Sequence, residues 1–296
     1  MDSSFGFLTM AFGPTKYIRQ AEVLAMSMKR NMPGVPVALI TDRPLTSSLF
    51  DKIVLMPQYP IAGAVLKLWM YQYSPFDETL FVDADCIVTR PFSDELHEIR
   101  RYPFTPVVAN YLGPENRDIF VKDLGAALRS VGGRKFPKFN GGVYFFRRGG
   151  EAKQIFSAAQ SVMERAEELG LINFDQAGPG EETVIGLALA QLGMTDLYDD
   201  GGRLMRTPLN SAGRIKINPL GGGCSFMKEG KLVEPAICHF CGDWQHSPTY
   251  GIASLTVREG RLPSTSEKLR IWREFLISQS WRRIWRKGRR LFAKMD

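Results

Sequence analysis

Short apolar runs alternate with helical patterns through the first ninety residues of the chain. The runs at residues 5–12, 35–42, 51–56 and 79–83 end in polar or turn residues, as buried strands do. Residues 17–30 and 63–73 carry apolar side chains at helical spacing between these runs. This order predicts an α/β fold with a mostly parallel twisted sheet, flanked by helices and joined by right-handed crossovers.

The pattern continues without a repeat or a low-complexity linker. It predicts strands at residues 107–109, 141–146 and 236–239, helices at 151–168 and 181–193, and a mixture of loop and helix over 113–138. Gly221 to Gly223 predicts a turn. We therefore expect one continuous domain over residues 1–263, followed by a tail over residues 264–296.

Polar residues follow three of the predicted parallel strands. Thr9 to Phe12, Thr41-Asp42 and Asp83-Ala84-Asp85 stand where these strands end. Ligands of such sheets bind beyond the carboxyl ends of the strands, which lie at one edge. We therefore expect these segments to form a single site.

Composition and charge exclude several classes of protein. The chain has 296 residues, of which 44% are hydrophobic and 23% charged, as in globular proteins. The net charge of +7 belongs to the tail, where ten basic residues face three acidic ones, so residues 1–263 are neutral. A neutral body argues against a nucleic-acid partner. We find neither a membrane-spanning run nor a secretory signal, and expect a cytoplasmic protein with reduced cysteines.

The tail itself has a distinctive pattern. From Trp281 onward, apolar residues recur near helical spacing with arginines and lysines between them. This predicts a basic amphipathic helix of the kind that lies on membranes. We expect residues 269–295 to bind an anionic membrane surface, which would make the protein peripheral on the inner membrane face. The alternative is a helix docked on the protein's own body.

The strand that ends in Asp83-Ala84-Asp85 is the strongest chemical signal. Two carboxylates one residue apart lie on the same side of an extended chain and repel each other there. A divalent cation neutralises them, and oxygen ligands suit Mn²⁺ or Mg²⁺. Such a cation can stabilise a departing nucleoside diphosphate. The alternative is a solvated turn, which the apolar runs on both sides disfavour.

Several segments together resemble glycosyltransferase family eight, the family of glycogenin and of the bacterial lipooligosaccharide galactosyltransferases. They follow in the family's order between residue 5 and about residue 250, and they are Thr9 to Gly13 with Tyr17, Thr41-Asp42, Leu66 to Trp69, Thr79 to Val88, Phe139 to Val143, Gly180 to Glu182, and His239 to Gly242. The resemblance implies a GT-A fold and transfer of a sugar with retention of its anomeric configuration.

The resemblance also implies roles for individual residues. The metal ligands would be Asp83, Asp85 and His239. The nucleotide would be held by Thr9, Ala11, Phe12, Tyr17, Asp42, Lys67, Asp83 and Gly242. The donor sugar would lie against Asn140, Gly141, Glu181 and Glu182, of which Asn140, Glu181 and Glu182 would assist catalysis.

The chain departs from the family's pattern at two places. After His-Phe-Cys-Gly it lacks the lysine that clamps the pyrophosphate, so Gln245 or His246 would stand in, or Lys216, Lys228 or Arg214 would supply the charge. Glu181-Glu182 replaces an Asp-Gln pair, which leaves the donor sugar open.

We therefore expect a metal-dependent enzyme that moves a hexose from UDP-glucose or UDP-galactose to a hydroxyl of a glycan or lipid-linked acceptor. The alternative is a catalytically silent scaffold that binds nucleotide sugars. A sugar-nucleotide pyrophosphorylase would need a longer, glycine-rich basic loop than residues 12–16 provide.

Overall fold

A six-stranded sheet forms the centre of the computed structural model, which describes residues 4–57, 63–175 and 178–292. The strand order is β3-β2-β1-β4-β7-β6. The strands are β1 (Phe5–Ala11), β2 (Val37–Thr41), β3 (Lys52–Leu55), β4 (Glu78–Val82), β6 (Phe104–Leu112) and β7 (Phe136–Arg147).

Four neighbouring strands of this sheet, β3, β2, β1 and β4, are parallel, and β7 is antiparallel to both of its neighbours, β4 and β6. Ala11 pairs with Thr41 at the carboxyl ends of β1 and β2. Since β4 runs in the same direction, the segments that follow β1, β2 and β4 begin at one edge. The α/β class and the mostly parallel sheet predicted above are confirmed.

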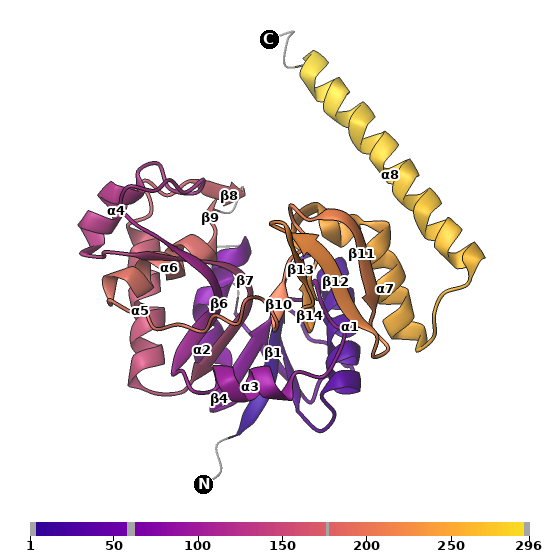
Figure 1. The fold of residues 1–296 in the computed structure, drawn as a ribbon, viewed down its shortest axis with the longest axis horizontal. Helices are drawn as coiled ribbons and strands as arrows, with labels where there is room; N and C mark the ends of the chain where they lie inside the picture. Colours follow the sequence, from indigo (N-terminus) through magenta and orange to yellow (C-terminus); the bar gives the residue numbers. More distant parts are fainter. Residues whose placement is uncertain (1–3, 58–62, 176–177, 293–296) are drawn as a thin grey trace.

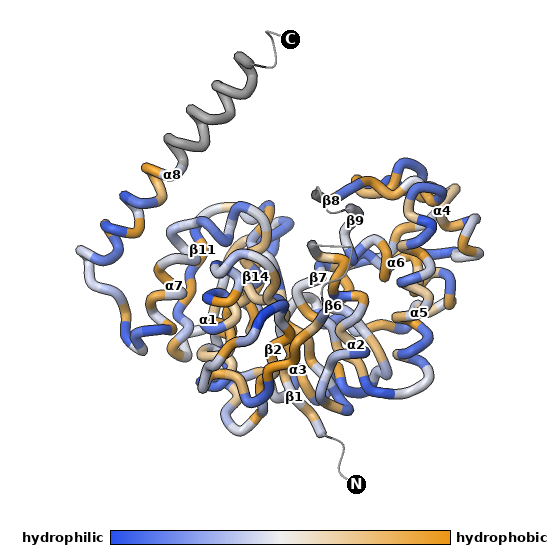
Figure 2. Tube along the Cα trace, turned by 180° about the vertical axis from the view of Figure 1, so that it is seen from behind, coloured by the Kyte–Doolittle hydropathy of each residue, from blue (hydrophilic) through white to orange (hydrophobic). Residues whose placement is uncertain are grey.

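Both faces of the sheet are buried, because successive side chains of a strand point to opposite sides. Leu8 and Met10 join one hydrophobic cluster, whereas Phe7 and Ala11 join another. Helices α4 (Leu124–Val131), α5 (Gly150–Glu164) and α6 (Glu181–Gln191) lie on the first side, and α1 (Thr15–Asn31) and α3 (Ser93–Ile99) on the second (Figure 1). Hydrophobic positions concentrate along β1 and β2 (Figure 2).

Smaller sheets lie beside the central one. In one of them β14 (Ile237–His239) lies between β10 (Met205–Arg206) and β5 (Cys86–Val88). In another, β12 (Gly223–Lys228) lies between β11 (Ala212–Asn218) and β13 (Lys231–Val233). A short ladder joins β8 (Asn173–Asp175) to β9 (Gly178–Pro179). Because β5 follows the acidic turn after β4, its pairing with β14 brings a late segment to the edge of the main sheet.

Some element bounds differ from the sequence prediction. Residues 63–73 form a 3-10 helix, η1 (Gly63–Trp69), and a short α2 (Met70–Tyr73), since η1 buries four consecutive residues rather than one helical face. Strand β7 starts before residue 141, at Phe136, and pairing with β6 holds its polar position Lys138 in the sheet. The helix predicted over 151–168 ends at Glu164.

The chain ends in two helices beyond η2 (Gly242–His246). Helix α7 (Pro248–Glu259) packs beside α1, and α8 (Thr265–Phe292) extends away from the body (Figure 1). Side chains of α8 are described as far as Ser278, so Trp281 and Trp285 lie outside the described side chains. Among the described helices, none combines the length and the apolar character that crossing a bilayer requires.

Candidate functional site

The acidic turn lies between β4 and β5 and is fixed by backbone hydrogen bonds. Asp83 N–H donates to the Gly142 carbonyl at 2.9 Å, which ties the turn to β7. Cys86 N–H donates to the Asp83 carbonyl at 3.0 Å, and Phe240 N–H donates to the Asp85 carbonyl at 3.1 Å. One hydrogen bond within the turn and two to other parts of the chain, β7 and the residue after β14, therefore hold the turn in place.

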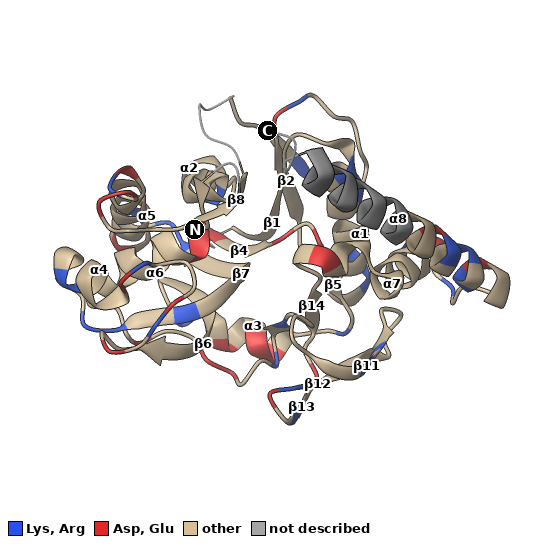
Figure 3. Ribbon diagram, turned by 90° about the horizontal axis from the view of Figure 1, so that it is seen from above, with Lys and Arg blue, Asp and Glu red and all other residues tan. Residues whose placement is uncertain are grey.

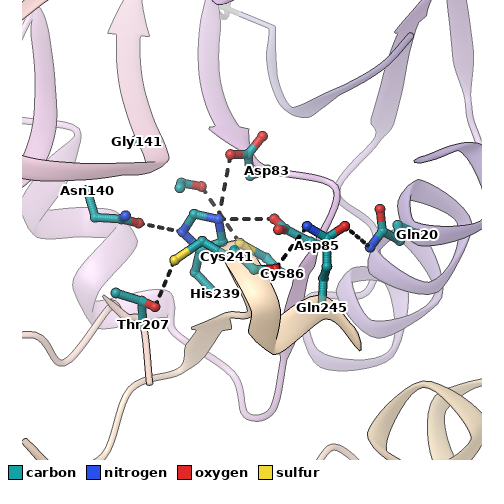
Figure 4. A network of polar contacts seen from close by, with 12 residues as sticks. Gln20, Asp83, Asp85, Cys86, Asn140, Gly141, Thr207, His239, Cys241 and Gln245 are labelled. Atoms are coloured by element: carbon teal, nitrogen blue, oxygen red, sulfur yellow. Dashed lines mark hydrogen bonds and ion pairs between the residues drawn. The ribbon is translucent and has the colours of Figure 1, made fainter. Parts of the chain in front are cut away.

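His239 brings an imidazole to this turn. It pairs with Cys86 across the β14–β5 ladder, and its Nε2 lies 3.0 Å from Asp85 Oδ1 and 3.6 Å from Asp83 Oδ2 (Figure 4). The ring is buried. Burial alone would lower the pKa of His239, but the Asp85 carboxylate raises it overall, and in turn His239 lowers the pKa of Asp85 against the effect of burial.

The ring of His239 occupies space that only a glycine leaves. A Cβ at Gly142 would overlap the imidazole at Nδ1. That same Nδ1 contacts the side-chain oxygen of Asn140, which also lies on β7. The Asn-Gly-Gly segment found in the sequence therefore serves close side-chain packing around this histidine.

Lys67 forms the second part of the cluster. Its ammonium lies 2.6 Å from Asp83 Oδ2 and 2.6 Å from Glu181 Oε1, and it donates to the Gly141 carbonyl at 3.1 Å. An ammonium has three N–H donors, so all of them have partners within the protein. Lys67, which the resemblance assigned to the nucleotide, thus crosslinks the acidic turn to α6.

One buried ammonium faces two carboxylates here, and the pKa values reflect it. Burial opposes the charged form of Lys67, but Asp83 and Glu181 raise its pKa overall. Burial raises the pKa of Glu181 to about 7, although Lys67 opposes that rise. Glu181 is therefore close to a balance between its acid and its carboxylate near neutral pH.

Glu182 points toward β7 from the first turn of α6. Its Oε1 accepts the Gly141 N–H at 2.7 Å and lies 3.2 Å from Asn140 Nδ2. A Cβ at Gly141 would overlap Glu181 and come within 2.9 Å of the Tyr144 hydroxyl. The four residues expected around the donor sugar, Asn140, Gly141, Glu181 and Glu182, therefore lie together.

The residues expected around the nucleotide lie along the strand ends. Asp42, after β2, accepts the Gly13 N–H at 2.9 Å and pairs with Arg43 at 2.8 Å, which lowers its pKa. Phe12 and Tyr17 are partly buried there. Thr9 and Ala11 lie within the sheet, with their side chains buried under α1.

The remaining residues proposed to bind the nucleotide or its pyrophosphate lie in the segment after His239 or beside it. Gly242 begins η2 with a φ of 62°, and Gln245 donates to its carbonyl at 3.0 Å and contacts Gln20. Lys228 donates to the carbonyls of Thr207 and Leu209, at 2.9 and 3.0 Å. The Thr207 hydroxyl contacts Cys241 Sγ at 3.0 Å, so Lys228 lies beside the His239 segment.

Arg214 and Lys216, the other two cations considered above, line a groove with Trp272 of α8. They lie on β11, an element that the sequence analysis did not predict, because its apolar alternation is weak. Gln20 and Thr207 were also missed, since neither stands in a motif.

The side chains present fit a divalent cation. Asp83, Asp85 and His239 offer two carboxylates and one imidazole nitrogen, with an oxygen of each carboxylate 3.6 Å or less from His239 Nε2, and this donor set suits Mn²⁺ or Mg²⁺. Cys86 Sγ also lies within 4.8 Å of the ligand atoms of Asp85 and His239. However, burial raises the pKa of the Cys86 thiol, and the protonated thiol is a poor ligand.

The strand order, the acidic turn after β4 and the histidine on β14 together define the class of fold. It is the GT-A fold of glycosyltransferases, with its candidate site at the carboxyl edge of the parallel strands.

Comparison with solved structures identifies particular proteins of this fold. The galactosyltransferase LgtC, solved with donor and acceptor sugar analogues, matches 91% of this chain and 99% of its own at 16% identity, with a TM-score of 0.54. The bifunctional glycosyltransferase WbbM, in its apo form, matches 88% of this chain and 52% of its own at 12% identity, with a TM-score of 0.50. No protein-family model and no curated protein sequence matches the chain.

Proposed function

We propose that this protein is a metal-dependent glycosyltransferase that moves a hexose from a UDP-sugar, UDP-glucose or UDP-galactose, to a hydroxyl of a glycan or lipid-linked acceptor with retention. The observation that carries the proposal is the convergence of Asp83, Asp85 and His239 at the edge where α/β folds bind ligands. The GT-A fold and the similarity to LgtC support it.

Each part of the site has a task in this proposal. Asp83, Asp85 and His239 hold Mn²⁺ or Mg²⁺, which when bound neutralises the charge of the leaving diphosphate. Asp42, Phe12 and Tyr17 receive the base and ribose. Lys67 keeps Asp83 and Glu181 in position through its three hydrogen bonds. Glu181 and Glu182 border the donor sugar, where a carboxylate can orient the acceptor hydroxyl or stabilise positive charge on the sugar.

Thermal unfolding with and without Mn²⁺ tests this proposal, because a ligand that binds only the folded state raises its melting temperature. We expect a UDP-hexose to stabilise the protein only when the cation is present. Asp85→Asn should abolish that dependence, whereas Asp94→Asn, at an exposed position on α3, should preserve it. An equal shift without metal would contradict the metal site.

A catalytically silent scaffold is the second candidate, and one observation favours it. All three N–H groups of the Lys67 ammonium donate to oxygens of the protein, so none of them is available to a bound phosphate. Release of UDP from a UDP-hexose separates the two candidates. Release that depends on Mn²⁺ and on Asp85 supports the enzyme, and metal-dependent binding without release supports the scaffold.

We also propose that α8 lies on an anionic membrane surface. Its described part exposes Leu269, Trp272 and Leu276 at helical spacing, next to Lys268 and Arg270. Basic positions recur along this part of α8 (Figure 3). Sedimentation with phosphatidylglycerol vesicles tests this, with phosphatidylcholine vesicles for comparison. Trp272→Glu should weaken binding to the anionic vesicles, and Ile119→Glu, at an exposed position outside α8, should leave it unchanged. Equal binding by both variants would favour the alternative of a helix docked on the body.

A further inference from the structure

The side-chain amide of Asn140 lies between a carboxylate and the imidazole of His239. Its Nδ2 is 3.2 Å from Glu182 Oε1, and its Oδ1 contacts His239 Nδ1 (Figure 4). These two contacts connect the first turn of α6 to β14 through β7. An amide in this position can be oriented in two ways, and its neighbours decide between them.

Glu182 fixes the orientation of the amide. Its Oε1 accepts the backbone N–H of Gly141 at 2.7 Å, and a backbone N–H can only donate. The same oxygen therefore acts as an acceptor toward Asn140, which must present its NH₂ group to it. The reverse orientation would place the amide oxygen against Oε1, and two acceptors repel each other. The amide oxygen is thereby turned toward His239.

The orientation of the amide then fixes the imidazole. The Asn140 oxygen only accepts, so Nδ1 of His239 must carry a proton to donate to it. The ring cannot easily rotate, because it is 4% exposed and fills the space left by the missing side chain of Gly142. Nε2 is the nitrogen that faces Asp85 and Asp83, so a cation bound by these carboxylates takes the place of the Nε2 proton and meets the lone pair of that nitrogen.

We propose that Glu182 and Asn140 are positioning residues that hold His239 in the Nδ1–H tautomer and direct Nε2 at a divalent cation. This inference rests on the proposed function only in requiring a cation at Asp83, Asp85 and His239. It gives Asn140 and Glu182 a role distinct from contact with the donor sugar. Hydrogen-bond partners of metal-ligating histidines contribute about 10- to 100-fold to metal affinity.

Cation affinity, measured by the loss of the free Mn²⁺ electron paramagnetic resonance signal, tests the inference without an activity assay. Asn140→Leu removes the acceptor of the Nδ1 proton and should weaken Mn²⁺ binding by about 10- to 100-fold. Glu182→Leu releases the amide and should act in the same direction. Glu182→Gln is the matched control, because its carbonyl oxygen still accepts the Gly141 N–H and keeps the amide oriented. Its Mn²⁺ affinity should stay within about threefold of the wild type.

The ¹⁵N resonances of the His239 ring give a second measurement that a merely structural role would not change. With Mg²⁺, the wild type and Glu182→Gln should show Nε2 as a metal-bound nitrogen and the proton on Nδ1, and in Glu182→Leu the fraction of rings in this state should fall. The loss of signals in His239→Gln assigns the ring. If Asn140→Leu does not fold, Glu182→Leu alone carries both measurements.

The outcomes separate this inference from the function it rests on. A wild-type protein that binds no Mn²⁺ overturns the proposed metal site and the inference with it. A wild-type protein that binds Mn²⁺, with unchanged affinity and unchanged ring resonances in both leucine variants, overturns the inference alone.

Discussion

Replacing Lys67 with methionine would remove the only cation between a buried carboxylate, Glu181, and a partly buried one, Asp83, in the described part of the site. Asp83 and Glu181 each lie 2.6 Å from the Lys67 ammonium, and the side chains of Lys67 and Glu181 are 11% and 5% exposed. Methionine fills a similar volume but leaves both carboxylates without their partner. The variant therefore isolates the charge of Lys67 from its packing.

The expected loss of stability follows from that burial. Removing one partner of a buried ion pair costs about 3–5 kcal/mol, because a remaining carboxylate either stays charged and desolvated or must take up a proton. For a domain of this size, 1 kcal/mol corresponds to about 2 °C in melting temperature, so we expect Lys67→Met to melt about 6–10 °C below the wild type. A divalent cation at Asp83 would replace part of the missing charge. Mn²⁺ should therefore stabilise the variant more than it stabilises the wild type.

Thermal unfolding followed by circular dichroism, with and without Mn²⁺, measures both effects. Lys153→Met, which changes an exposed lysine on α5, is the control and should change stability by less than about 0.5 kcal/mol. A melting temperature of Lys67→Met within about 2 °C of the control would correspond to a loss of about 1 kcal/mol or less. The ammonium would then not compensate these carboxylates, and the reasoning would fail.

Three further predictions follow from the same structure. Gly142→Ala should weaken Mn²⁺ binding at least about tenfold, because its Cβ would displace the His239 ring. Gly150→Ala, where no atom lies within 4 Å of the added Cβ, should preserve Mn²⁺ binding, and equal affinities of the two variants would contradict the packing argument. Gly186→Ala should lower the free energy of unfolding in urea by about 1–3 kcal/mol, because its Cβ would lie 2.6 Å from the Phe136 ring, and an unchanged urea midpoint would show that the ring has room to move. Burial raises the pKa of Glu181 from 4.5 to about 7, so the folded state holds a proton that the unfolded chain releases at lower pH. The wild type should therefore lose stability relative to Glu181→Gln as the pH rises from about 4.5 to 7, and urea titrations showing a constant difference over that range would argue against the raised pKa.

Much of the fold could be predicted from the sequence, because strand and helix periods are local properties. Both faces of a parallel sheet are buried, so β1, β2 and β4 appear as continuous apolar runs, and the polar residues after them indicate the ligand-binding edge. The antiparallel β11, β12 and β13 were missed, since one exposed face leaves only a weak alternation interrupted by glycines. The short 3-10 helix η1 has no periodic signal of its own.

The amino-acid pattern was sufficient to predict the α/β fold and to select Asp83, Asp85 and His239 as candidates, because an acidic pair after an apolar strand can be recognised in one dimension. How these side chains interact became visible in the folded chain alone. The contact of His239 with Asn140 spans 99 positions and that of Lys67 with Glu181 spans 114. Which hydrogen bonds form depends on the distances and orientations of side chains brought together by packing, and a linear pattern of residue types does not contain them.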